Sequence, residues 1–129
     1  MKATRILVVD DDFALANVIK TQLIRIGFGA ISAYSGDGGM GEIEKDPVDI
    51  IITDINCGKM DGVWLARKIR EIDNRRGTGA LTPIVFMSGD LGSYTIEELE
   101  KLSPYLIGKP FTFPALMALI HEIMRTNSP

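Results

Sequence analysis

Short apolar runs rich in β-branched residues alternate with stretches of helical periodicity along the chain, and this alternation constrains the fold more than any other feature. The predicted strands cover residues 6–9, 28–33, 48–53, 83–87 and 105–107. The predicted helices cover residues 13–26, 35–45, 63–72, 95–102 and 113–124. Because right-handed crossovers join such units, we predict an α/β fold in which helices cover both faces of a doubly wound, five-stranded parallel sheet.

Glycine distorts this pattern in two places. The segment 35–45 contains four glycines, and an interior glycine costs a helix about 1 kcal/mol relative to alanine. We therefore expect a short, distorted or late-starting helix there. Residues 73–82 are polar, basic and glycine-rich, so we expect a solvated loop that carries Arg75 and Arg76.

Length and charge exclude several classes of protein. A chain of 129 residues fits one domain, which we place at residues 1–129. The 14 basic and 17 acidic residues leave a net charge of −3, so we expect no nucleic acid partner. No apolar run approaches the ~20 residues that span a bilayer, and the N-terminus contains no signal-peptide core, so we expect no membrane contact. The single cysteine, Cys57, excludes an internal disulfide and fits a cytoplasmic location, although its place near Asp54 makes it a candidate reactive thiol.

Polar side chains follow four of the five predicted strands, at the point where each strand ends. These residues are Asp10, Asp11 and Asp12, then Asp54, Ser88 and Lys109. In an open parallel sheet, the carboxyl ends of the strands form one edge, and ligands bind in the crevice there. We therefore predict that these residues converge on one site, although Asp12 also fits the simpler role of capping the following helix.

The residue types at this edge suit phosphoryl transfer. Three carboxylates close together repel each other unless a cation lies between them, and Mg²⁺ prefers carboxylate, carbonyl and water oxygens. A lysine and a hydroxyl group can receive an anion with tetrahedral oxygens, and a carboxylate can act as the nucleophile that accepts it. The sequence therefore predicts a magnesium-dependent site that forms an aspartyl phosphate.

With these residues in place, the chain resembles the receiver domains of two-component response regulators along nearly its whole length. The matching segments are Ile6-Leu7-Val8-Val9-Asp10-Asp11-Asp12, Asp54-Ile55-Asn56-Cys57-Gly58-Lys59-Met60-Asp61-Gly62, Phe86-Met87-Ser88-Gly89 and Lys109-Pro110-Phe111. The resemblance implies the flavodoxin-like strand order 2-1-3-4-5. It also implies that Asp54 is the phosphoryl acceptor and a metal ligand. Asp11 would bind Mg²⁺ directly, Asp10 through water, and Asn56 through its backbone carbonyl.

The resemblance assigns further roles to the residues around the phosphoryl group. Ser88 would move to bind that group, and Lys109 would form an ion pair with it, next to a cis peptide bond between Lys109 and Pro110. The position of the family's aromatic switch residue, three residues before the lysine, holds Leu106. Tyr105 could take that role only if Gly108 formed a bulge.

Two other departures from the family pattern are Gly58, where proline is usual, and the glycine-rich second helix. The resemblance implies a phosphoacceptor domain of a two-component or phosphorelay system, which is a signalling switch and not an ordinary enzyme. Its phosphodonor would be a sensor histidine kinase or a histidine phosphotransfer protein, and hydrolysis would end the signal. A downstream target would bind the face formed by the fourth helix, the last strand and the fifth helix.

Two alternatives remain open at this point. A degenerate receiver would act as an adaptor without phosphorylation, which the changes at positions 58 and 106 would suit. A dehalogenase-like, magnesium-dependent phosphatase also uses an aspartate at a strand end. That family has a second aspartate two residues later, where this chain has Asn56.

Overall fold

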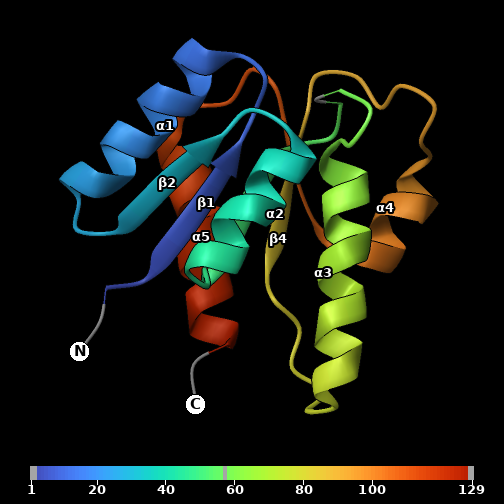
Figure 1. The fold of residues 1–129 in the computed structure, drawn as a ribbon. Coiled ribbons are helices and arrows are strands. Elements are labelled where there is room, and N and C mark those ends of the chain that lie inside the picture. Colours follow the sequence, from blue (N-terminus) through green and yellow to red (C-terminus); the bar gives the residue numbers. More distant parts are fainter. Residues whose placement is uncertain (1–2, 57, 128–129) are drawn as a thin grey trace.

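The computed structural model describes residues 3–56 and 58–127, so Cys57 and its possible reactivity lie outside the described residues. Strands and helices alternate from one end of the described chain to the other (Figure 1). The strands are β1 (Arg5–Val9), β2 (Gly29–Ala33), β3 (Ile50–Asp54), β4 (Ile84–Ser88) and β5 (Tyr105–Gly108). The helices are α1 (Phe13–Arg25), α2 (Gly36–Lys45), α3 (Gly62–Arg76), α4 (Ile96–Leu102) and α5 (Phe113–Thr126).

The strands form one parallel sheet in the order β2-β1-β3-β4-β5, which confirms the predicted α/β class and strand order. The chain reverses its direction of travel across the sheet after β2, so β1 and β3 lie side by side. In register, Val9 lies opposite Thr53, Asp54 opposite Met87, and Ser88 opposite Gly108. The carboxyl ends of these strands therefore lie along one edge of the sheet.

Two hydrophobic cores cover the two faces of the sheet, as the alternating side-chain directions of its strands require. On one face, Val8 and Ile52 pack with apolar residues of α1 and α5. On the other, Leu7 and Phe86 pack with residues of α3 and α4. The central strands are buried on both faces, which is why they read as continuous apolar runs in the sequence.

The expectation of a short, distorted or late-starting second helix is wrong. Helix α2 covers 10 residues and begins at the first glycine, and the Ser35 side chain caps it by accepting a hydrogen bond from the Gly38 N–H at 3.1 Å. Two of its glycines pack closely against their neighbours. A Cβ on Gly36 would collide with the backbone oxygens of Met60 and Asp61, and a Cβ on Gly39 would lie 3.1 Å from Val9. Burial against the sheet therefore outweighs the low helix propensity of glycine.

The third helix is longer than expected, because α3 continues through residues 73–76 and ends at Gly77 in the left-handed conformation (φ 67°). Arg75 and Arg76 are consequently exposed on its last turn and do not lie in a loop. The polar residue Asp73 lies in this helix although it is only 4% exposed. Its carboxylate accepts hydrogen bonds from Thr82 N (3.0 Å), Thr82 Oγ1 (2.9 Å) and Arg70 Nη1 (2.8 Å), which offset the cost of its burial.

Helix α4 begins at the capping box expected from the sequence: the Thr95 hydroxyl accepts from the Glu98 N–H, and the Glu98 carboxylate accepts from the Thr95 N–H, each at 3.1 Å. Among residues 3–56 and 58–127, no helix is long and apolar enough to cross a membrane.

Candidate phosphoacceptor site

The three aspartates after β1 have different surroundings. Asp10 is fully buried, and its Oδ1 accepts a hydrogen bond from the Asp12 N–H at 2.9 Å. Asp11 is exposed. Asp12 caps α1, because its Oδ1 accepts from the Leu15 N–H at 3.1 Å. The first two residues are thus available to the site, whereas Asp12 has the capping role considered in the sequence analysis.

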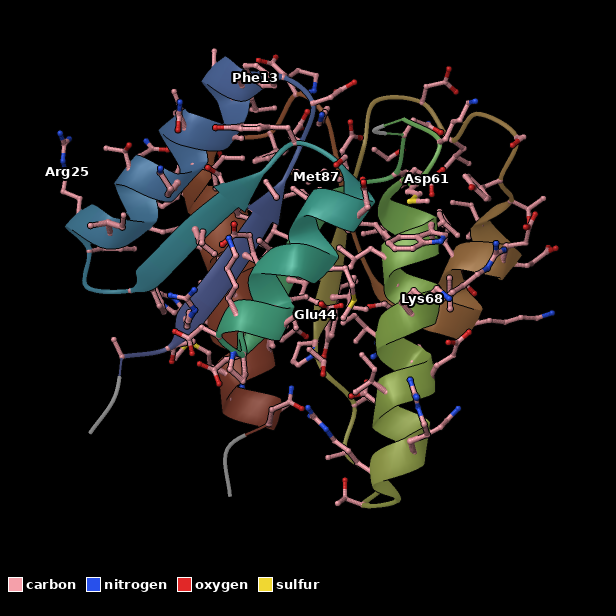
Figure 2. All side chains as sticks on the ribbon, in the orientation of Figure 1. Phe13, Arg25, Glu44, Asp61, Lys68 and Met87 are labelled. Atoms are coloured by element: carbon pink, nitrogen blue, oxygen red, sulfur yellow. The ribbon has the colours of Figure 1, made fainter. Side chains whose placement is uncertain are left out.

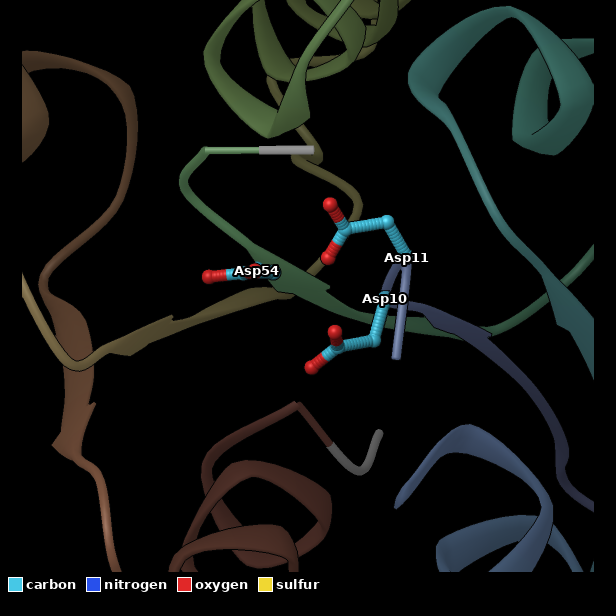
Figure 3. Close-up of side chains that lie close together, drawn as sticks. All are labelled: Asp10, Asp11 and Asp54. Atoms are coloured by element: carbon cyan, nitrogen blue, oxygen red, sulfur yellow. The ribbon is translucent and has the colours of Figure 1, made fainter. Parts of the chain in front are cut away.

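Asp54 is the last residue of β3, and the start of α3 lies directly against it. A Cβ on Gly62 would collide with the Asp54 carbonyl oxygen, so glycine alone allows the helix to begin so close to the strand. Figure 3 shows the side chains of Asp10, Asp11 and Asp54 converging from the ends of β1 and β3. One carboxylate oxygen from each residue lies within 4.8 Å of the others.

Lys109, just after β5, supplies a cation to this acidic group. Its Nζ donates a hydrogen bond to Asp10 Oδ2 at 2.7 Å and lies 3.5 Å from Asp54 Oδ2. The Lys109 N–H donates to the Ser88 carbonyl oxygen at 2.7 Å, and the peptide bond between Lys109 and Pro110 is cis, as expected. The lysine is thereby held between two of the three carboxylates.

The protonation equilibria at the site depend on these neighbours. Burial is the largest influence on the Asp54 carboxyl and raises its pKa; Lys109 opposes this effect, and the negative charges of Asp10 and Asp11 add to it. For Lys109, burial lowers the pKa, but the hydrogen bond to Asp10 and the attraction of Asp10 and Asp54 together raise it. Lys109 therefore carries its positive charge at neutral pH, and the ionised form of Asp54 carries a cost of burial that the single lysine does not remove.

Ser88 and Asn56 border the same edge. Ser88 is the last residue of β4 and is half-buried. Asn56 is exposed, and its side-chain amide donates a hydrogen bond to the Asp90 carbonyl oxygen at 2.8 Å. The two loops that follow β3 and β4 are thus joined beside the carboxylates.

The position of the aromatic switch residue is occupied by Leu106, whose side chain is 40% exposed. The β4–β5 pairing runs residue for residue from Val85–Tyr105 to Ser88–Gly108. The bulge at Gly108 on which the Tyr105 alternative depended is therefore absent. Tyr105 packs with the core that contains α5, whereas Leu106 points to the other side of the sheet.

Two further residues, Asp61 and Tyr94, form a hydrogen bond beside the site. Asp61 is 7% exposed and caps α3, because its Oδ1 accepts from the Trp64 N–H at 2.9 Å, and its Oδ2 accepts from the Tyr94 hydroxyl at 2.7 Å. An aspartate directly before a helix is a recognisable capping signal and could have identified Asp61. Nothing in the local sequence indicates the partner of Tyr94.

The donor set at this edge suits a hard divalent cation. Asp10, Asp11 and Asp54 offer only carboxylate oxygens, which are the ligand atoms that Mg²⁺ prefers. A cation there would also oppose the effects of burial and of the neighbouring carboxylates, which together raise the pKa of Asp54. The structure thus provides an acidic pocket with the oxygen ligands that a Mg²⁺ ion requires.

Comparison with known proteins agrees with this geometry. Residues 6–121 match the family model of the response regulator receiver domain, and the chain therefore belongs to this family of regulatory signalling domains. The structure is similar to that of a two-component response regulator from Clostridium difficile, with a TM-score of 0.82 and 28% identity, over 97% of this chain and 99% of that chain.

Curated relatives include longer proteins. The chain is 30% identical over 125 residues to the transcriptional regulatory protein DltR of Streptococcus agalactiae, which covers 96% of this chain and 53% of that protein. It is 25% identical over 123 residues to the autoinducer 1 sensor kinase/phosphatase LuxN of Vibrio campbellii, covering 95% of this chain and 14% of that protein. The chain thus spans about half, or much less, of the length of these relatives.

Proposed function

We propose that residues 1–129 act as one receiver domain in which Asp54 accepts a phosphoryl group from a phosphohistidine of a partner protein. The observation that carries this proposal is the position of the Asp54 carboxylate. It lies within 4.8 Å of the carboxylates of Asp10 and Asp11 and 3.5 Å from Lys109 Nζ. A nucleophile is thereby placed between a site for a cation and a fixed positive charge, which is what transfer of a phosphoryl group requires.

The transfer follows from these positions. A carboxylate oxygen of Asp54 attacks phosphorus, the new P–O bond forms as the P–N bond breaks, and the imidazole nitrogen leaves with its electron pair and takes up a proton. The Lys109 ammonium group offsets negative charge on the phosphoryl oxygens, and the Ser88 hydroxyl donates a hydrogen bond to one of them. In hydrolysis, water attacks phosphorus, the P–O bond to Asp54 breaks, and inorganic phosphate leaves.

Mg²⁺ would be held by the carboxylates of Asp11 and Asp54 and the backbone carbonyl of Asn56, with Asp10 acting through water. When bound, this ion supplies positive charge that stabilises the phosphoryl oxygens during transfer. Asp10 also keeps Lys109 in position through the 2.7 Å hydrogen bond. It would therefore interact with both the lysine ammonium group and the metal ion.

The partners that we propose are a sensor histidine kinase or histidine phosphotransfer protein as donor, and a downstream protein that binds α4, β5 and α5. The similarity to part of a sensor kinase/phosphatase and to part of a transcriptional regulator supports partners of this kind. The exposed side chains of Ile96 and Leu106 supply apolar area on the α4 and β5 part of this face. We place the protein in the cytoplasm, where such donors act.

A second function, that of an adaptor independent of phosphorylation, is favoured by one observation. Leu106 has no polar group with which to respond to a change at Ser88. The dehalogenase-like phosphatase has no such support, because Asn56 stands where that family has its second aspartate.

The proposal is tested by incubating the protein with Mg²⁺ and acetyl phosphate and measuring the intact mass. We expect one phosphoryl group per chain, lost on treatment with hydroxylamine and absent in Asp54→Asn. Asp37→Asn, which changes an exposed aspartate in the first turn of α2, is the matched control and should be modified like the parent. Equal modification of the parent and Asp54→Asn would refute the assignment, and an unmodified parent would favour the adaptor.

A further inference from the structure

Among the described residues, two side-chain hydrogen bonds join the loop after β3 to the loop after β4. One is the bond from the Asn56 side chain to the Asp90 carbonyl oxygen, close to Ser88. The other, at the far end of the second loop, is the bond from the Tyr94 hydroxyl to Asp61 Oδ2, at 2.7 Å. The second bond is partly shielded from water, since Asp61 is 7% exposed and Tyr94 is half-buried.

The Asp61 end of this bond is fixed to the backbone around the phosphoacceptor. Figure 2 shows Asp61 at the N-terminal end of α3, where its Oδ1 caps the helix by accepting from the Trp64 N–H. The Gly62 N–H donates to the Ile55 carbonyl oxygen at 3.2 Å, and the Asp54 carbonyl leaves no room for a Cβ on Gly62. Asp61 therefore cannot move independently of the backbone at residues 54–55.

The Tyr94 end is fixed to α4. Tyr94 directly precedes Thr95, whose side chain and backbone form the capping box with Glu98. The helix that follows has only seven residues, and Leu99 is its buried residue. A short helix with so little buried area is held in place largely by what happens at its ends, so the position of Tyr94 affects the position of α4.

We propose that the Tyr94–Asp61 hydrogen bond couples the phosphoacceptor site to α4, holding this helix in its unphosphorylated position and breaking when Ser88 moves toward a phosphoryl group on Asp54. This inference rests on the proposed function. Tyr94 is a positioning residue here. Its aromatic ring carries a hydroxyl group, which Leu106 lacks, and the ring lies on the α4 side of the sheet.

The physical basis is the arrangement of the two bonds. The Asn56 side chain holds the Asp90 carbonyl, so a displacement of Ser88 turns the rest of the loop about this point, and Tyr94 moves relative to Asp61. Burial and the hydrogen bond to Asp61 raise the pKa of Tyr94 to about 12, so its hydroxyl remains a donor throughout the physiological range. Because the bond exists in one arrangement and not in the other, it biases the equilibrium between them.

The same coupling must act in the opposite direction, since linkage between two sites is reciprocal. Removing the bond by Tyr94→Phe should shift α4 toward its phosphorylated position before any ligand is added. It should also make the site bind a phosphoryl mimic more tightly, by about 2- to 10-fold for one hydrogen bond of this kind.

The test uses backbone amide chemical shifts of the whole chain during titration with beryllofluoride in the presence of Mg²⁺. In Tyr94→Phe, the amides of residues 95–99 should lie, without beryllofluoride, between the free and saturated positions of the parent. The dissociation constant for beryllofluoride, followed at residues 54–55, should fall by the factor given above. Tyr105→Phe removes the hydroxyl of a tyrosine on the other face of the sheet and should behave like the parent.

The outcomes separate this inference from the function on which it rests. If the parent shows no beryllofluoride response at residues 54–55, the proposed function fails. If the parent responds but Tyr94→Phe leaves residues 95–99 at the parent's free positions, or binds beryllofluoride no more tightly, the coupling by Tyr94 is refuted. A lower unfolding midpoint without these two changes also refutes it, because that is the effect of a merely structural hydrogen bond.

Discussion

Replacing Asp54, the proposed phosphoacceptor, by its uncharged isostere in Asp54→Asn should make the metal-free protein more stable. In the native structure, the Asp54 carboxylate lies within 4.8 Å of the carboxylates of Asp10 and Asp11, and Lys109 is the cation beside it, at 3.5 Å from Oδ2. Unfolding separates these charges and returns the carboxylate to water. The substitution removes this buried charge from the native state without changing the size of the side chain.

The magnitude follows from the distances and from the burial of Asp54. With an effective dielectric constant of about 20, attraction to Lys109 contributes about 5 kcal/mol, and repulsion from Asp10 and Asp11 at the limiting distance costs about 3.5 kcal/mol each. These two contributions largely offset each other, since Lys109 also forms a hydrogen bond with Asp54, and the cost that remains is that of burying the Asp54 charge. We expect the free energy of unfolding to rise by about 1–2 kcal/mol, which in a domain of this size raises Tm by roughly 5 °C.

The effect depends on pH in a defined direction. Because the pKa of Asp54 is raised in the folded protein, its ionised form is the destabilising one. The cost is absent below the ordinary aspartate pKa of 3.8 and fully developed above the higher pKa of the folded state. The advantage of Asp54→Asn should therefore be largest near neutral pH and shrink as the pH falls through the folded-state pKa.

Thermal unfolding followed by circular dichroism, with EDTA and low salt, measures this difference at a series of pH values. Asp37→Asn is the control: the hydrogen bond with Ser35 lowers the pKa of Asp37, so removal of its charge should give no stabilisation. A Tm of Asp54→Asn at or below that of the parent at pH 7 would refute the reasoning. A gain in Tm that did not change with pH would also refute it, because it could not come from ionisation.

Three further predictions concern the same edge of the sheet. Mg²⁺ at ten times its dissociation constant should stabilise the parent by about 1.4 kcal/mol through mass action, seen as a higher Tm, and Asp11→Ala should lose most of this gain. Lys109→Met should slow incorporation of phosphate from acetyl phosphate at Asp54 roughly a hundredfold, measured as the rate of mass increase, and an unchanged rate would exclude a role for this cation in the transfer. Gly62→Ala should lower the free energy of unfolding in urea by about 1–3 kcal/mol because its Cβ meets the Asp54 carbonyl, whereas Gly41→Ala, with no atom within 4 Å of the added Cβ, should be neutral or stabilising.

Much of this protein could be predicted from its sequence, because the relevant signals are local and repeated. The apolar runs ending at Val9 and near Asp54 are typical of strands buried on both faces, and parallel strands place their carboxyl ends at one edge whatever the loops do. That rule alone brings Asp10, Asp54 and Lys109 together from distant parts of the chain, as observed. Capping signals likewise need only a few neighbouring residues, which is why Thr95 marked the start of α4 correctly.

The tertiary structure decided what depends on partners distant in sequence. Helix propensity disfavoured the glycine-rich segment 36–45, but Gly36 and Gly39 allow α2 to approach the neighbouring backbone and side chains closely, and this packing outweighs propensity. Asp73 continues α3 because Thr82 satisfies its buried carboxylate, a contact that composition does not reveal. The bond between Tyr94 and Asp61 spans 33 positions and depends on the relative placement of two loops after adjacent strands. Such contacts exist only once the sheet has brought both loops to the same edge, so local sequence carries no signal for them.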